Sequence, residues 1–302
     1  MDITMYDVIV LGSGPAGLTA ALYTARANKK TIVLGGATLG GQMSMIARLE
    51  NYPGWDGDGM SLAEFMRKQA ESFGAKIVPV SAKSVDGDAE SGFNVLGDDG
   101  KNYVGKTLVF ATGASPRKLE IDGAKELVGH GVSYCATCDG FFYYGKDVIV
   151  LGGGNAALND ALYLADIAKS VKIVYRKGSF FRAEEVLRNR IAERKNIECI
   201  FNTELKKVAA IPGTEKLVVT TIDGTEIEAD GLFVAIGHEA NTDYLDDGVL
   251  RDEMGRLIPH ELPAGTFVAG DVRSNIKMQI ATAVGTGCTA GMDAVAYLNS
   301  QE

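Results

Sequence analysis

The sequence predicts an α/β protein made of two similar layered units, with the second inserted into the first. The first observation is that an apolar strand, a glycine-rich loop and a helix follow one another twice, at residues 6–28 and again at 147–168. The second is that short strand-like segments follow each of them, as in a small meander. The third is a C-terminal strand and helix, within residues 266–298, that have no such loop of their own. This last segment is expected to complete the first unit, which makes the two units nested.

Composition and charge limit the classes of function. The chain has 302 residues, of which 46% are hydrophobic, and this is enough for two domains. A formal net charge of −9 argues against nucleic acid or an anionic membrane as a partner. No apolar run approaches the roughly 20 residues of a membrane helix, and the first residues lack the pattern of a secretion signal. Only two of the four cysteines are paired by spacing, so we expect a cytoplasmic protein.

The first unit begins with a βαβ pattern. Residues 6–11 form a short apolar run, residues 18–28 have helical spacing, and residues 31–34 predict a second strand. An amphipathic helix is expected at residues 62–73. The segments that follow predict a small meander and then an apolar strand; they are residues 76–80, 92–96, 101–104 and, for the last strand, 107–111.

The same order then restarts in the second unit. Residues 147–151 predict a strand, 158–168 a helix and 171–174 the next strand. A second meander is expected to include residues 225–228 and 231–236. After it, residues 266–269 predict one more strand and residues 281–298 a helix, which we assign to the first unit.

The first loop, Gly12-Ser13-Gly14-Pro15-Ala16-Gly17, fits the pattern G-x-G-x-x-G between a strand and a helix. In this pattern the first glycine makes the turn, the second lets the backbone approach a pyrophosphate, and the third lets the helix pack on the strand. The helix N-terminus then faces the anion. The second strand ends in Leu34-Gly35-Gly36 without the acid that would hold an adenosine ribose, so that contact must come from elsewhere.

The second loop, Gly152-Gly153-Gly154-Asn155-Ala156-Ala157, fits G-x-G-x-x-A in the same context. Here the next strand ends in Tyr175-Arg176-Lys177, and Arg182 follows nearby. Cations at this point could hold a ribose 2′-phosphate, which would favour NADP over NAD. The alternative is a solvated basic strand end. Both loops predict Rossmann-like, three-layer nucleotide-binding domains.

Between the loops stand two cysteines, Cys135 and Cys138, followed at once by Asp139. This spacing lets both thiols lie on one turn at the start of a helix, where they can close as a reversible disulfide. Asp139 could donate or accept the proton that dithiol chemistry moves. A zinc site would need further ligands, and a chance pair of core cysteines is the other alternative. A redox pair is favoured because two nucleotide-type loops flank it.

With these residues in place, the chain resembles the low-molecular-weight thioredoxin reductases of the flavin-dependent disulfide reductase family, over essentially its whole length. The run from Ser133 to Gly140 is the most specific part of the resemblance. The other segments that carry it are Gly12 to Gly17, Gly40-Gly41-Gln42, Glu50-Asn51-Tyr52-Pro53-Gly54, Ala111-Thr112-Gly113, Gly152 to Ala157, Gly237-His238, Asn241-Thr242 and Gly270-Asp271 with Gln279.

The resemblance implies two domains that bind different cofactors. FAD would bind a discontinuous domain at residues 1–117 and 245–302, and residues 118–244 would carry the nicotinamide-nucleotide site, for NADP(H), and the dithiol. The protein would be a homodimer. The implied FAD-binding residues are Gly12, Gly14, Pro15, Ala16, Gly17, Gly41, Gln42, Asn51, Thr112, Gly113, Gly270, Asp271 and Gln279. The implied nicotinamide-nucleotide residues are Gly152, Gly154, Asn155, Ala156, Arg176, Lys177 and Arg182.

The resemblance also implies the order of electron transfer. Electrons would pass from FAD to the Cys135–Cys138 disulfide and then to thioredoxin or a thioredoxin-like protein. Cys138 would be the thiol that reacts with the flavin, Cys135 would attack the partner's disulfide, and Asp139 would be the acid and base. One disulfide cannot touch a buried flavin and a protein at once, so a domain rotation is implied, with hinges near Arg117 and Tyr244.

Departures from the family lie mostly in the inserted domain and leave two alternatives. NADPH-dependent members carry His-Arg-Arg where this chain has Tyr175-Arg176-Lys177, and lysine lacks the planar fork of arginine. One alternative is therefore the same reductase with ferredoxin or another donor. The other, from a different class, is an FAD-binding redox sensor or assembly partner without significant turnover.

Overall fold

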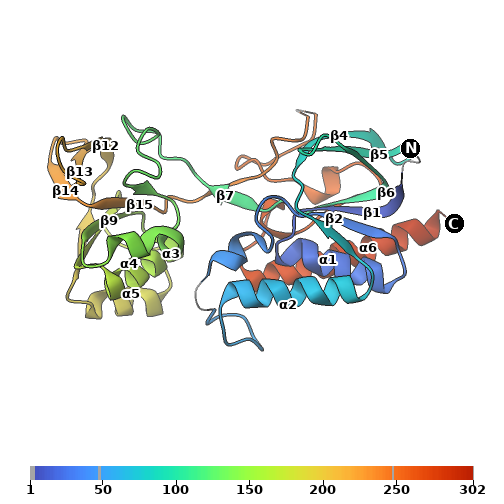
Figure 1. The fold of residues 1–302 in the computed structure, drawn as a ribbon, viewed down its shortest axis with the longest axis horizontal. Coiled ribbons are helices and arrows are strands. Elements are labelled where there is room, and N and C mark those ends of the chain that lie inside the picture. The colour runs from blue at the N-terminus through green and yellow to red at the C-terminus, as the bar shows by residue number, and fades with distance from the viewer. Residues whose placement is uncertain (1–3, 47–48, 247, 302) are drawn as a thin grey trace. The chain divides into compact units, whose positions relative to one another are not determined.

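The computed structural model describes residues 4–46, 49–246 and 248–301 and divides into two compact units (Figure 1). Unit 1 comprises the chain up to Ser115 and from Glu239 onward, and unit 2 comprises Pro116–His238. The predicted α/β architecture, with one layered unit inserted in another, is confirmed. The domain boundaries predicted from the sequence, after residues 117 and 244, lie a few residues further along the chain.

Unit 1 is built on a sheet in the order β3-β2-β1-β6-β5-β4, with β17 paired to β6. Strands β1, β2, β3 and β17 run parallel, whereas β4, β5 and the first half of β6 form antiparallel pairs. Because β17 lies in this sheet, the C-terminal segment completes the first unit as predicted. The strands are β1 (Met5–Leu11), β2 (Thr31–Leu34), β3 (Lys76–Val78), β4 (Ala82–Asp88), β5 (Gly92–Gly97), β6 (Asn102–Phe110) and β17 (Thr266–Val268).

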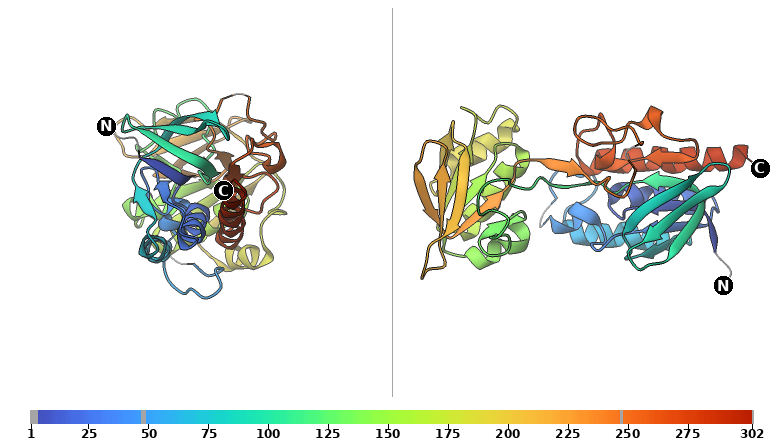
Figure 2. Two further views of the ribbon diagram at one scale, coloured as in Figure 1. Left: turned by 90° about the vertical axis from the view of Figure 1, so that its right-hand side faces the viewer. Right: turned by 90° about the horizontal axis from the view of Figure 1, so that it is seen from above.

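Helices cover one face of the parallel part of this sheet, formed by β3, β2, β1, β6 and β17. The β4–β5 hairpin, which continues the sheet from β6, lies over the other face of that part (Figure 1, Figure 2). Along β1, Val8 and Val10 face the helices, while Ile9 and Leu11 pack into the core on the hairpin side. A Cβ at Gly287 would run into the Ala16 carbonyl, so glycine is what lets two of the helices pack this closely. The helical segments are α1 (Pro15–Arg26), α2 (Gly59–Ser72), α6 (Ile280–Ser300), η1 (Gly41–Met45), η3 (Pro259–Glu261) and η4 (Gly270–Val272).

Unit 2 repeats this design with a parallel sheet in the order β11-β10-β9-β15-β8. Helices lie on one face and the antiparallel sheet β12-β13-β14 on the other (Figure 1). The strands are β8 (Val132–Ser133), β9 (Asp147–Leu151), β10 (Ser170–Tyr175), β11 (Ile197–Phe201), β12 (Leu205–Ala210), β13 (Leu217–Thr221), β14 (Glu226–Ala229) and β15 (Gly231–Val234). The helical segments are α3 (Ala136–Asp139), η2 (Gly140–Tyr143), α4 (Asn155–Ile167) and α5 (Glu185–Glu193).

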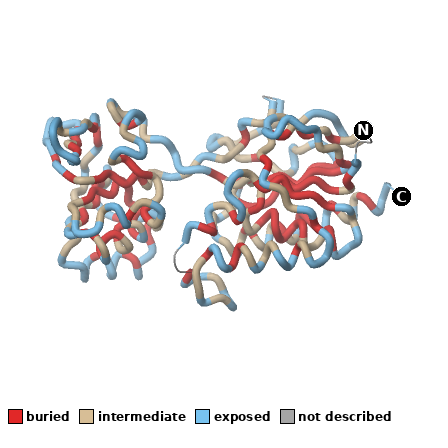
Figure 3. The backbone as a smooth tube through the Cα atoms, viewed as in Figure 1, coloured by how far each residue is buried: buried red, intermediate tan, exposed pale blue. Residues whose placement is uncertain are grey.

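The inner strands of both units are buried, as Figure 3 shows in red, and most of their residues are apolar. In β9, Val148 and Val150 pack against α4, whereas Ile149 and Leu151 pack against the antiparallel sheet. Such doubly buried strands read as continuous apolar runs, which is why they could be located from the sequence.

The first predicted meander is wrong in three respects. Residues 76–80 do not belong to it, because β3 pairs in parallel with β2. Residues 101–104 and 107–111 are one strand, β6, whose apolar pattern is interrupted at Gly105-Lys106, where only part of the strand is buried. Strand β4 was missed because its sequence, Ala-Lys-Ser-Val-Asp-Gly-Asp, is polar and partly exposed at a sheet edge. In the second predicted meander, residues 231–236 were misplaced, because β15 pairs in parallel with β9 and β8.

The chain passes between the units twice, through β7 (Ala114–Pro116) and β16 (His238–Ala240), and these two segments pair with each other. The hinges predicted near Arg117 and Tyr244 flank this ribbon, and they stay predictions. Among the residues that the structure describes, no helix combines the length and the apolar character needed to cross a membrane.

Candidate active site

Cys135 and Cys138 form a disulfide in unit 2, directly after the short edge strand β8. Cys135 is the N-cap of the one-turn helix α3, and its Sγ accepts a hydrogen bond from the Cys138 backbone N–H at 3.2 Å. The predicted turn that brings both thiols together is therefore present, although the helix is only four residues long. A backbone N–H aimed at sulfur favours the thiolate form of Cys135 once the disulfide is reduced.

Asp139 is attached to this turn through Ser133, for which the sequence alone predicted no role. The Ser133 hydroxyl donates to Asp139 Oδ2 at 2.6 Å, and its oxygen accepts from the Cys135 N–H at 3.1 Å. Ser133 is only 4% exposed. The carboxyl and the cysteine backbone are thus joined through one buried oxygen atom. A serine two residues before the first cysteine was the only signal in the sequence.

Two aromatic side chains that follow the dithiol in sequence are exposed to solvent. Phe141 is 79% exposed and Phe142 is 71% exposed, and they meet edge to face with ring centroids 6.5 Å apart. Exposed rings of this size are uncommon on a protein surface without a partner. These residues too were missed at the sequence level, because an aromatic pair in a glycine-rich stretch could equally be core.

The first glycine loop has the form that a pyrophosphate requires. Gly12 has a φ of +106°, and a Cβ there would run into the Ala111 carbonyl. Gly14 is the N-cap of α1 and makes no side-chain capping hydrogen bond. The space that a Cβ would occupy at Gly14 is open. Pro15 occupies the first turn, where its missing N–H costs nothing. The free backbone N–H groups of this turn can therefore meet an anion.

The structure brings several predicted FAD-binding residues together across long sequence separations. A Cβ at Gly41 would lie 3.3 Å from the Gly14 Cα, and a Cβ at Gly270 would lie 2.8 Å from the Ala16 Cβ. Asn51 Nδ2 donates to Gln279 Oε1 at 3.1 Å.

Two other predicted FAD-binding residues, Gln42 and Thr112, form hydrogen bonds with other residues of unit 1. Gln42 Nε2 donates to the Ala114 carbonyl at 2.6 Å. The Thr112 hydroxyl donates to the Asn241 carbonyl at 2.7 Å and lies 3.2 Å from the Tyr244 hydroxyl, and Gly113 has a φ of +68°. Asn241 and Tyr244 were not predicted as part of this site.

Asp271 offers a direct test of whether a flavin nucleotide fits. Its Oδ1 atom is buried and has no hydrogen-bond partner among the described residues. Burial raises the pKa of the Asp271 carboxyl, and the charge of Arg256 opposes the shift. A buried acceptor without a partner costs free energy, so this atom calls for a ligand that donates, such as a ribityl hydroxyl. Together with the open space at Gly14, it fits FAD.

The second glycine loop has the same backbone form. A Cβ at Gly152 would run into the Ala235 carbonyl, while Gly154, the uncapped N-cap of α4, has open space around it. Asn155 forms two hydrogen bonds with Glu184, a residue the sequence did not single out: its Nδ2 donates to Glu184 Oε1 at 2.7 Å, and its Oδ1 accepts from the Glu184 N–H at 2.8 Å. Ala156 is exposed in the first turn. These residues fit a second dinucleotide.

Three cations follow the end of β10. Arg176, Lys177 and Arg182 are all exposed, and the Arg182 guanidinium lies 5.5 Å from the centroid of the Phe181 ring. Tyr175 packs over the loop, since a Cβ at Gly153 would lie 2.5 Å from its ring. The cations are therefore free to meet an anion in solvent, and no carboxylate stands among residues 175–182.

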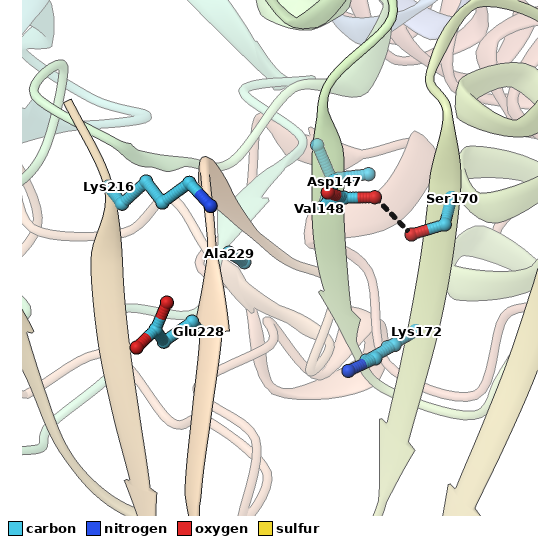
Figure 4. A pocket seen from close by; sticks show the side chains of 7 residues that line it. All are labelled: Asp147, Val148, Ser170, Lys172, Lys216, Glu228 and Ala229. Carbon is cyan, nitrogen blue, oxygen red and sulfur yellow. Dashed lines mark hydrogen bonds between the residues drawn. The ribbon is translucent and has the colours of Figure 1, made fainter.

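A polar pocket of about 210 Å³ in unit 2 lies away from these residues (Figure 4). It is lined by Asp147, Ser170, Lys172, Lys216 and Glu228, with Val148 and Ala229. Asp147 and Ser170 begin β9 and β10, whereas the glycine loop and the cations follow the other ends of these strands. Ligands of such sheets bind at the carboxyl ends of the strands, so the pocket is not the nucleotide site. Among the described residues, no group of three or more His, Cys, Asp or Glu side chains could hold a metal ion.

Comparison with known proteins identifies the family. The model of the pyridine nucleotide-disulphide oxidoreductases matches residues 6–287. The thioredoxin reductase of Streptomyces clavuligerus is 41% identical, with 97% of this chain and 94% of that protein covered. The thioredoxin reductase of Rickettsia conorii is 37% identical, with 99% of this chain and 100% of that protein covered.

Solved structures agree with this result. The crystal structure of Lactococcus lactis thioredoxin reductase has a TM-score of 0.91 and 34% identity, covering 98% of this chain and 99% of that one. The structure of the T. acidophilum enzyme has a TM-score of 0.89 and 32% identity, covering 99% of each chain. Enzymes of this class use FAD and NADPH. The chain therefore belongs to the pyridine nucleotide-disulphide oxidoreductases, and within them to the low-molecular-weight thioredoxin reductases, which are flavoprotein disulfide reductases.

Proposed function

We propose that the chain uses NADPH as its electron donor and reduces thioredoxin, or a thioredoxin-like protein, through FAD and the Cys135–Cys138 pair. The observation that carries this proposal is the disulfide itself, closed between two cysteines three residues apart in the unit that also holds the second glycine loop. Homodimer formation and a cytoplasmic location stay predictions from the sequence.

The donor is proposed from the second loop and the cations that follow β10. Gly154 leaves room for a pyrophosphate, and Arg176, Lys177 and Arg182 offer positive charge where a ribose 2′-phosphate lies in this fold. The strand end lacks the acid that would select the 2′-hydroxyl of NADH. No described feature favours ferredoxin over a nicotinamide nucleotide.

FAD, when bound, supplies two-electron transfer between the nicotinamide and the disulfide. Asp271 and Gln279 would hold it from unit 1, and the first loop would hold its pyrophosphate.

The protein's own cysteines carry the next part of the reaction. In the reduced enzyme the Cys135 thiolate attacks one sulfur of the partner's disulfide, and that S–S bond breaks as a mixed disulfide forms. Asp139, in its protonated form, gives its proton to the thiolate that leaves. Cys138 then passes its thiol proton to Asp139 and attacks the Cys135 sulfur, so that the mixed disulfide breaks and the enzyme disulfide closes. The second thiolate that leaves the partner takes up this proton, and the partner is released with both of its cysteines reduced.

A protein partner is proposed from the surface beside the dithiol. Phe141 and Phe142 offer two exposed rings next to Cys138, which is itself exposed. Aromatic side chains of this kind often dominate the binding energy of protein interfaces.

Replacing Cys138 by serine tests the proposed function. Cys138→Ser is expected to keep its flavin and its reduction by NADPH, and to lose thioredoxin reduction entirely, because no second thiol can take up the electrons. The measurement is thioredoxin thiol formation together with the flavin spectrum. Cys199→Ser, at a free cysteine of the same unit, is the matched control and is expected to behave as wild type. Turnover retained in Cys138→Ser would refute the assignment.

A further inference from the structure

Ser133 makes a short hydrogen bond beside the dithiol. Its hydroxyl lies 2.6 Å from Asp139 Oδ2 but 3.3 Å from the Cys135 carbonyl, and its oxygen accepts from the Cys135 N–H at 3.1 Å. A hydroxyl has one proton, so the shorter contact, to a carboxyl oxygen, is the bond that it makes. A serine that only shaped the turn would satisfy backbone groups alone. Here its proton is committed to a titratable side chain.

We propose that Ser133 is a positioning residue that holds Asp139 where it can deliver a proton in dithiol–disulfide exchange. The inference rests on the proposed function, in which Asp139 is the acid. In this role Ser133 acts through Asp139.

The surroundings of Ser133 explain why it can fix the carboxyl. It ends β8, whose two residues pair with Leu232 and Phe233 of the buried strand β15, so its backbone is held by the sheet. Its side chain is 4% exposed. Asp139 closes α3 through its own N–H, which donates to the Cys135 carbonyl at 3.1 Å. Without the hydroxyl, the carboxyl would keep this backbone position but lose its fixed direction.

The chemistry of the leaving group makes the role testable. When an alkyl disulfide is attacked, the departing thiolate is basic and benefits from a proton donor. An aromatic disulfide such as 5,5′-dithiobis(2-nitrobenzoate) releases a weakly basic thiolate that needs no proton. Loss of proton delivery should therefore slow exchange with thioredoxin and leave exchange with the aromatic disulfide unchanged. A distorted turn would slow both.

The experiment compares four forms of the holoenzyme, reduced anaerobically and mixed with either disulfide: wild type, Ser133→Ala, Asp139→Asn and the double variant. With thioredoxin we expect Asp139→Asn to be slowed by about a hundredfold, as for loss of a general acid. We expect Ser133→Ala to be slowed by about tenfold, as for loss of one hydrogen bond to a charged group. The double variant should match Asp139→Asn within about twofold, because the hydroxyl then has no acid to position.

Ser170→Ala is the matched control. Its hydroxyl donates to Asp147 Oδ1 at 2.7 Å, and Figure 4 shows this bond. Ser170 begins β10, at the end of the parallel sheet opposite the second glycine loop. We expect wild-type rates with both disulfides. If Ser133→Ala does not accumulate as a flavoprotein, Ser133→Thr keeps the hydroxyl and should exchange within about twofold of wild type.

Two results would overturn the inference. One is equal slowing of Ser133→Ala with both disulfides, and the other is a Ser133→Ala effect that persists undiminished in the Asp139→Asn background. If Asp139→Asn exchanges at the wild-type rate, the acid itself is misassigned, and the inference fails with that assignment. The Cys138→Ser result would still stand independently.

Discussion

The two glycine loops have the same backbone design and differ in what surrounds the next strand end. Each follows a buried parallel strand, and each places an uncapped glycine, Gly14 or Gly154, at the start of a helix with open space beside it. In unit 1, β2 leads to Gly35, whose carbonyl accepts a hydrogen bond from the Ser13 hydroxyl of the loop at 2.7 Å.

In unit 2 the corresponding strand end is basic and aromatic. Tyr175 packs on the loop, and Arg176, Lys177 and Arg182 reach solvent. The glycine loop thus predicts that a dinucleotide binds, and the residues at the end of the next strand determine which dinucleotide it is. The two loops should therefore respond alike to an added backbone substituent, and differently to the loss of a charge at the following strand end.

The largest effect is expected from an added methyl group at the open glycines. Gly14→Ala and Gly154→Ala put a Cβ where nothing in the protein lies within 4 Å, so folding should be preserved. The same methyl would obstruct a pyrophosphate. We expect Gly14→Ala to lose FAD affinity, and Gly154→Ala to keep FAD but lose NADPH affinity, each by about a hundredfold, since both interactions are charge-assisted. Flavin content and stopped-flow reduction by NADPH measure the two losses. If both variants lost flavin, the division of the loops would be wrong.

A smaller effect should follow from removing one cation. Arg182→Gln is expected to raise KM for NADPH by about tenfold, the loss of one charged contact to a phosphate, and to leave KM for NADH unchanged. Arg194→Gln is the control, because it removes a charge beyond the far end of α5, where Arg194 pairs with Asp166 at 2.7 Å. Equal changes in both KM values for Arg182→Gln would mean that this arginine does not read the 2′-phosphate.

The smallest effect concerns the helices that follow the loops. Helix α1 contains no acid, whereas α4 carries Asp160, whose pKa burial raises to about 7. The folded protein then holds a proton that the unfolded chain releases near its ordinary pKa. Stability from this group is present at low pH and is lost as pH rises toward 7. Asp160→Asn should therefore raise the free energy of unfolding by about 1 kcal/mol at pH 8 and by less at pH 5.

Calorimetric unfolding at the two pH values measures this difference. An equal shift in the melting temperature at pH 5 and pH 8 would show that Asp160 does not titrate in this range. Wild-type turnover is expected throughout, because Asp160 has no part in the proposed exchange.

Local features and the return of the C-terminal segment to the first unit could be predicted from the sequence, whereas individual side-chain contacts between distant residues could not. Both loops and the dithiol turn lie within a few residues of chain, so glycine spacing and cysteine spacing were enough to find them. Thr112 and Tyr244 are 132 residues apart, and Asn51 and Gln279 are 228 apart. Only the paired strands bring such residues together, and no spacing pattern carries that information. Ser133 is a different case, since its position was visible but the direction of its hydroxyl was not.

NADPH is proposed to reduce the flavin through the second loop. Anaerobic titration of the bound flavin with NADPH, NADH and reduced ferredoxin, followed by the flavin absorbance, tests this proposal. We expect fast bleaching by NADPH, slower bleaching by NADH at the same concentration, and none by ferredoxin. Bleaching by ferredoxin alone would contradict the proposal, and would mean that the second loop and its cations do not serve a nicotinamide nucleotide in this protein.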